Sequence, residues 1–266
     1  MAIGKPFGSL WRWLGGATRR NGGLTDDLWR ETVDGLPFLA RLSREESSRL
    51  RRLAERFLAE KEFTAAGGLE LTGAMCASIA VQGCLPILDL GLECYRGWVG
   101  VIVYPDEFIV PRAVEDEFGV VHEYDDVASG EAWEGGPLLI SWRDAQMAGG
   151  GYNVVIHEFV HKLDMLNGEV DGIPPLPAGI SRREWEDTLL AAYEDFRARV
   201  DAVEARGEST GEVLAIDPYA AESPGEFFAV LSESFFETPD VPRREYPALY
   251  ALFCRFFRAT SESGKG

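Results

Sequence analysis

The chain lacks long apolar segments, and it has few cysteines that could form disulfide bonds or bind a metal. No run of about 18 apolar residues occurs, so we expect no transmembrane helix. The N-terminal region has basic residues but neither a continuous apolar core nor a small-residue cleavage site, which argues against a secretory signal. The four cysteines form no C-x-x-C pair and are irregularly spaced. They indicate neither a zinc knuckle nor a disulfide framework, and reduced cysteines favour a cytoplasmic location.

Positive charge is also scarce. The chain has 26 Lys and Arg against 44 Asp and Glu, which gives a net charge of -18 and an isoelectric point of about 4.6. Phosphate backbones and anionic membrane surfaces would repel such a chain, so we expect neither a nucleic acid nor a membrane as partner. An apolar fraction of 46% over 266 residues is nevertheless ample for a folded core.

Hydrophobic periodicity indicates an α+β fold of mainly helical character, with a small mixed or antiparallel sheet between two helical regions. Capping signatures at Ser43 and Thr72 begin two of the expected helices. We expect residues 1–24 to form a flexible tail, 25–260 one folded domain with a helical N-terminal portion, and 261–266 a disordered tail. Helices are expected over 43–58, 72–85, 152–166, 181–200, 225–236 and 246–258, and strands over 99–104, 108–110, 120–124 and 138–142.

One motif carries recognisable chemistry. Residues 157–161 read His-Glu-Phe-Val-His, the H-E-x-x-H pattern, within a run of apolar residues typical of a buried helix. Residues four apart share one face of a helix, so the imidazoles of His157 and His161 can converge on one zinc ion. Glu158, beside the first histidine, is then placed to take a proton from a water molecule that the metal activates.

A catalytic zinc site needs a third protein ligand. His122 is the only other histidine and is interpreted as structural, because it lies in an expected strand far upstream. Asp164 shares a helix face with His157 but lies about 10 Å along the axis from it, which suits a hydrogen bond to a ligand imidazole better than ligation. The glycine and third histidine of the metzincin pattern are absent.

The remaining candidates are glutamates of a later helical segment: Glu222, Glu226, Glu233 and Glu237. Glu226 begins an apolar helical run, where a carboxylate needs a cation, and zinc would supply it. Glu233 lies seven residues on, on the same face, and is a candidate partner behind a ligand. Glu222 and Glu237 are interpreted as solvated charges near helix ends.

Several separate stretches resemble the Mlc titration factor A family of bacterial zinc peptidases. They are NVVIHEFVHKLD at 153–164, LELT at 69–72, VIVYP at 101–105 and EFFAVLSE at 226–233, and the likeness spans about residues 25–258. The resemblance implies that residues 25–260 form a zincin-like catalytic domain. It further implies a gluzincin-like site with one zinc ion on His157, His161 and Glu226, and Glu158 as general base. The family's core is in turn similar to that of anthrax lethal factor, where a tyrosine seven residues before the ligand glutamate assists the reaction.

The position that matches this tyrosine is Tyr219, whose phenol would hydrogen-bond to the oxyanion of the tetrahedral intermediate. Without the resemblance, Tyr219 is equally well interpreted as a turn residue after Asp217-Pro218. The resemblance also implies an aminopeptidase-like activity on short peptides. It further implies a regulatory partner, since members in enteric bacteria associate with Mlc, a repressor of the glucose phosphotransferase system.

Two functions of different classes therefore stand as hypotheses, and a weaker third is a zinc hydrolase that acts on a non-peptide amide. The first is a zinc-dependent peptidase with Glu158 and Tyr219 as catalytic residues. The alternative is a non-catalytic zinc protein that binds and sequesters a transcriptional repressor, to which the acidic charge would be suited. An open metal position would favour the enzyme, and a fourth protein ligand would favour a structural metal.

Overall fold

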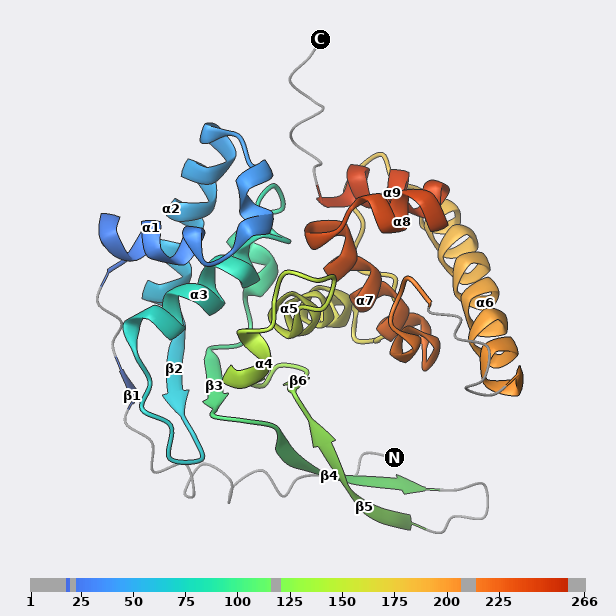
Figure 1. The fold of residues 1–266 in the computed structure, drawn as a ribbon, viewed down its shortest axis with the longest axis horizontal. Coiled ribbons are helices and arrows are strands. Elements are labelled where there is room, and N and C mark those ends of the chain that lie inside the picture. Colours follow the sequence, from blue (N-terminus) through green and yellow to red (C-terminus); the bar gives the residue numbers. More distant parts are fainter. Residues whose placement is uncertain (1–17, 20–22, 116–120, 207–213, 258–266) are drawn as a thin grey trace.

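The computed structural model describes residues 18–19, 23–115, 121–206 and 214–257. Helix α5 occupies the middle of the molecule, with α1 to α3 on one side and α6 to α9 on the other (Figure 1). The α-helices are α1 (Asp26–Asp34), α2 (Arg44–Glu60), α3 (Gly73–Cys84), α4 (Trp142–Ala145), α5 (Val154–Asp164), α6 (Arg182–Arg206), α7 (Pro224–Glu237), α8 (Asp240–Glu245) and α9 (Pro247–Phe257). Short 3-10 helices include η4 (Met165–Asn167) and η6 (Pro218–Ala221).

The main sheet is mixed and has the strand order β1-β2-β3-β7-β6. Strand β2 runs parallel to β3 and β3 parallel to β7, whereas β1 and β6 run antiparallel to their neighbours. Its strands are β1 (Thr18–Arg19), β2 (Glu62–Ala65), β3 (Gly100–Tyr104), β6 (Gly130–Ala132) and β7 (Leu138–Ser141). A separate antiparallel hairpin, β4 (Phe108–Glu115) with β5 (Val121–Ala128), projects from the body (Figure 1).

This architecture confirms the prediction of a mainly helical α+β fold with a small sheet: the main sheet is mixed, and the β4–β5 sheet is antiparallel. The capping box at Ser43 is present, and Thr72 caps α3. Within the expected N-terminal tail, the described residues Thr18–Arg19 pair with β2, and Leu24 lies in the core. Residues 261–266 lie outside the described part of the chain.

The core around α5 is aromatic on the side facing α2 and α3. Phe159 is fully buried, and its ring centroid lies 5.5 Å from Phe57, 5.2 Å from Tyr95 and 6.0 Å from Trp98. Gly83 of α3 allows this approach, because a Cβ there would lie 2.4 Å from the Phe159 ring. Packing of this kind fixes α5 in position and leaves its opposite face for polar side chains.

The fold also shows where the cysteines lie and how apolar the helices are. The described cysteines form no disulfide with one another, and Cys76 and Cys84 are buried among apolar residues as small hydrophobic side chains. No helix in the described ranges combines the length and apolar character needed to cross a membrane.

Candidate metal centre

Residues at its two ends determine where the H-E-x-x-H helix, α5, begins and ends. Asn153 caps α5 through its side-chain oxygen, which accepts a hydrogen bond from the backbone N–H of Ile156 at 2.9 Å. The helix ends at Asp164, and the chain continues through η4 to Gly168, which adopts a left-handed conformation with φ 92°. Every residue of α5 is buried, so its polar side chains need partners within the protein.

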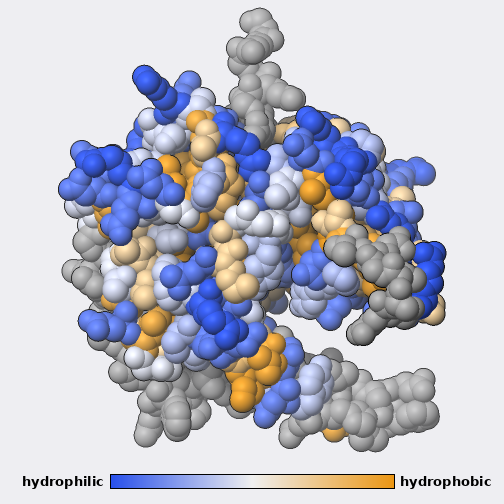
Figure 2. Space-filling model, in the orientation of Figure 1, coloured by the Kyte–Doolittle hydropathy of each residue, from blue (hydrophilic) through white to orange (hydrophobic). Residues whose placement is uncertain are grey.

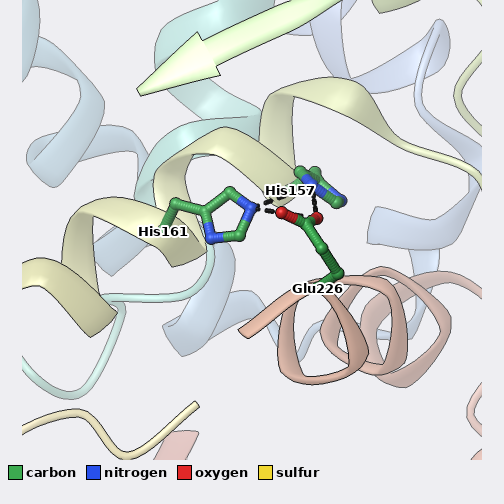
Figure 3. A group of neighbouring side chains, drawn as sticks. All are labelled: His157, His161 and Glu226. Carbon is green, nitrogen blue, oxygen red and sulfur yellow. Dashed lines mark hydrogen bonds and ion pairs between the residues drawn. The ribbon is translucent and has the colours of Figure 1, made fainter. Parts of the chain in front are cut away.

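Helix α7 presents the third side chain to α5. Ser223 caps α7 by accepting a hydrogen bond from the N–H of Glu226 at 3.1 Å, with Pro224 in the first turn. Glu226 is therefore in the first turn of α7, and its carboxylate points at the two imidazoles of α5 (Figure 3). Helix α5 packs more extensively against α7 than against any other described helix, which makes this arrangement part of the core packing.

Three potential ligand atoms converge at this point. Nε2 of His157 lies 3.0 Å from Nε2 of His161 and 3.0 Å from Oε2 of Glu226, and His161 Nε2 lies 3.3 Å from the same oxygen. Bonds of about 2.0–2.1 Å from a tetrahedral zinc ion would separate its ligand atoms by roughly 3.3 Å. The donor set and its spacing therefore fit a metal ion, and the three residues form a metal-type cluster with ligand atoms within 4.8 Å of one another.

A second carboxylate lies behind the first histidine. Oε1 of Glu233 is 2.7 Å from Nδ1 of His157, and its other oxygen accepts the backbone N–H of Asn153. An anionic acceptor at Nδ1 places the proton there and leaves the lone pair on Nε2, where a metal would bind. Burial opposes a positive charge on His157, but its hydrogen bonds with Glu226 and Glu233 outweigh that effect and raise its pKa.

Glu237, one turn beyond Glu233, corrects an expectation. It was predicted to be a solvated helix-end charge, yet it is buried, and its carboxylate accepts N–H groups of Gly149 at 2.9 Å and Gly151 at 2.8 Å. It also accepts the side-chain N–H of Asn153 at 2.8 Å. Glu237 thus holds the glycine-rich segment that leads into α5. Its position four residues after Glu233, on the same helix face, could have predicted this.

Asp164 is buried at the C-terminal end of α5, but among the described residues its hydrogen bonds do not reach an imidazole. Its Oδ2 accepts the N–H of Gly172 at 2.8 Å and so closes the loop after η4. Oδ1 of Asp164 is buried and has no hydrogen-bond partner in the described structure, and the same holds for Nδ1 of His161. Burial raises the pKa of Asp164 to about 7.

Two further ligand candidates come from the sequence. Glu222 is exposed as expected, and the side chain of His122 is not among those that the structure describes.

Glu158 and Tyr219 lie close to the cluster. Glu158 is buried, and this burial raises its pKa to about 7 against the opposing influence of the two histidines. Tyr219 is on η6, with its ring centroid 6.1 Å from that of His157 and 47% of its surface exposed. Desolvation, followed by the charges of Glu226 and Glu222, raises the pKa of Tyr219. Its phenol therefore remains protonated near neutral pH and available as a donor.

These side chains line a cavity of about 760 Å³. Its walls come from β5, β6, α5, η6 and α7, and the molecular surface is hollowed between the hairpin and the helices of the C-terminal half (Figure 2). No described lysine or arginine lines it, whereas seven carboxylates do: Asp126, Glu131, Glu158, Asp217, Glu222, Glu226 and Glu233. Two histidines on a buried helix and a glutamate from a second helix, facing such a cavity, are typical of a metallopeptidase.

Comparison with known proteins agrees with this class. The sequence model of the family described as "Glucose-regulated metallo-peptidase M90" matches residues 11–258, and the chain belongs to this family. Curated relatives named Mlc titration factor A confirm the resemblance noted from the sequence. Those from Salmonella arizonae and Salmonella typhi are each 41% identical over 255 residues, which cover 93% of this chain and 96% and 91% of theirs. That from Salmonella choleraesuis is 43% identical over 230 residues, 84% of this chain and 83% of its own.

Proposed function

We propose that this protein is a zinc-dependent peptidase with aminopeptidase-like activity. His157, His161 and Glu226 would hold the zinc ion, Glu158 would act as general base, and Glu233 would orient His157. The main support for this proposal is that two imidazole nitrogens and one carboxylate oxygen lie 3.0–3.3 Å apart. They line a cavity of about 760 Å³ together with Glu158. Two nitrogen donors and one oxygen donor are a typical catalytic zinc set.

The chemistry divides between the metal and the chain. A zinc ion at this site would polarise a peptide carbonyl and make water a stronger acid. Glu158 accepts the proton of the attacking water and returns it to the leaving amine, so that one carboxylate serves as base and then as acid. The pKa of about 7 that burial gives this carboxyl suits both roles. The Tyr219 phenol donates a hydrogen bond to the oxygen that becomes negative as the carbonyl is attacked.

Two features of the cavity support a peptide with a free amino terminus as substrate. The walls carry carboxylates and, in the described part of the chain, no lysine or arginine, so their field favours a positively charged α-amino group. Strand β6 pairs only with β7 among the described strands, and its residues Gly130 to Ala132 line the cavity. An extended peptide could hydrogen-bond along its open edge.

The test is hydrolysis of matched reporter peptides with free or acetylated amino termini, by the wild type and Glu158→Gln, with zinc measured on the same samples. We expect zinc in both proteins, turnover only in the wild type, and a strong preference for the free amino terminus. Turnover retained by Glu158→Gln would refute the general-base role. Equal hydrolysis of free and acetylated peptides would refute the aminopeptidase assignment while leaving a peptidase.

A second function is favoured by the relatives. They are named for titration of Mlc, and this chain carries a net charge of -18, which suits a partner with a basic surface. We propose that the protein also binds a repressor of the Mlc type where its host has one. Titration of that repressor by calorimetry at low and high salt should show binding that weakens with salt. A purely sequestering protein would bind it and hydrolyse no peptide.

The composition of the metal-type cluster argues for catalysis over a structural metal. It offers three candidate ligand residues in the described chain, all lining the cavity, which would leave room for water or substrate. A structural zinc would instead be enclosed by four protein ligands.

A further inference from the structure

Gly130 makes an unusually close approach to the proposed general base. It begins the edge strand β6 and lies opposite Ile140 of β7 in the antiparallel register. A Cβ at residue 130 would lie 2.4 Å from Oε1, 2.5 Å from Cγ and 2.7 Å from Cδ of Glu158. Carbon atoms in ordinary contact are about 3.5–4.0 Å apart, so any side chain at this position would displace either the strand or Glu158.

The backbone of Gly130 does not by itself require glycine. Its φ is not among the positive values found at other glycines of the described chain, and glycine weakens a strand interior. Close approach of Glu158 is thus the physical reason for glycine at this position.

Of the two groups, the strand is the better anchored. Strand β6 pairs along its length with Leu138, Leu139 and Ile140, all buried, and Ser141 donates its N–H to the carbonyl of Ser129 at 2.7 Å. Glu158, in contrast, has a flexible side chain whose bonds can rotate to move the carboxylate. Added volume at residue 130 would therefore move the carboxylate of Glu158 more readily than the backbone of β6.

We propose that Gly130 is a positioning residue, whose missing side chain sets where the Glu158 carboxylate lies beneath β6. This inference rests on the proposed role of Glu158 as general base. Misplacement of a reacting group by about 1 Å can lower a rate by about 100-fold, so a single methyl group at residue 130 should act mainly on turnover.

The first experiment compares Gly130→Ala with Gly73→Ala, a control in the first turn of α3 where a Cβ would meet no atom within 4 Å. We expect Gly130→Ala to lower kcat at least tenfold, with a smaller change in KM and with zinc still bound. Gly73→Ala should keep the wild-type kcat. Wild-type kcat in Gly130→Ala would overturn the proposal.

A second experiment reads the contact without using activity. The midpoint of urea denaturation is measured for Gly130→Ala, Glu158→Ala and the double variant, all free of metal. We expect Gly130→Ala to lower the midpoint in the wild-type background and to leave it nearly unchanged in the Glu158→Ala background, where the clashing side chain is gone. An equal drop in both backgrounds would overturn the proposal. If the wild type hydrolyses no peptide, the proposed function fails. The comparison of the two single variants with the double variant then decides by itself whether Gly130 sets the position of Glu158.

Discussion

Replacing Glu233 with alanine should weaken metal binding although Glu233 is not a proposed ligand. Its Oε1 lies 2.7 Å from Nδ1 of His157, and it is only 2% exposed. Removing the carboxylate leaves the imidazole free to rotate and to place its proton on either nitrogen. It also leaves the buried backbone N–H of Asn153 without its acceptor.

The magnitude follows from the role of such partners. Loss of a hydrogen-bonded group behind a metal-ligating histidine costs about 10- to 100-fold in metal affinity, or about 1.4–2.7 kcal/mol. Glu233→Gln keeps one acceptor oxygen but loses the charge, so its loss should fall between the wild type and Glu233→Ala. Glu222→Gln removes a nearby charge without touching a ligand imidazole, and it should change affinity least.

The assay is competition for zinc between the metal-free protein and a chromophoric chelator, at one pH and salt concentration, with circular dichroism to check that each variant is folded. Zinc affinity within twofold of the wild type for folded Glu233→Ala would refute the reasoning. An equal loss of zinc affinity in Glu222→Gln would also refute the reasoning, because the effect would then come from long-range charge rather than from the orientation of His157.

Three further predictions concern stability. Phe159→Ala should lower the unfolding free energy by about 3–5 kcal/mol in denaturant titrations, because it empties the aromatic centre beside α5; a loss below about 1 kcal/mol would contradict that packing. Burial lowers the pKa of Lys61 to about 8, so between about pH 8 and 10 the unfolded chain binds more protons and the contribution of Lys61 to stability rises with pH. The unfolding free energy of the wild type relative to Lys61→Met should therefore increase over that range, and a flat difference would argue against a depressed pKa. Glu237→Gln should speed hydrogen exchange at the amides of Gly149 and Gly151, whose acceptor it weakens; unchanged exchange would mean that Glu237 does not hold this segment.

Features with a local cause were predictable from the sequence. The helix of His157 and His161 follows from apolar periodicity and from its asparagine cap and glycine end, which act over a few residues. Glu226 could be singled out because a carboxylate in an apolar helical run needs a partner. Its meeting with the two histidines then follows from helix packing that brings α5 against α7.

Features that depend on distant parts of the chain were not predictable. Strand β6 has the sequence Gly-Glu-Ala, with no β-branched or aromatic residue, and forms only because β7 offers it an edge. Glu237 resembles an ordinary helix-end charge until the glycine-rich segment folds onto it. Asp164 has the spacing of a partner for an imidazole, but its hydrogen bond from the N–H of Gly172 depends on a loop that returns from further along the chain. In each case a tertiary contact outweighs the local pattern.

Anomalous diffraction at the zinc absorption edge, from crystals of the zinc-loaded protein, tests the central claim most directly. The account predicts one strong peak per chain, within about 2.0–2.2 Å of Nε2 of His157, Nε2 of His161 and the carboxylate of Glu226. A peak elsewhere, or a fourth protein side chain closing the coordination, would contradict it.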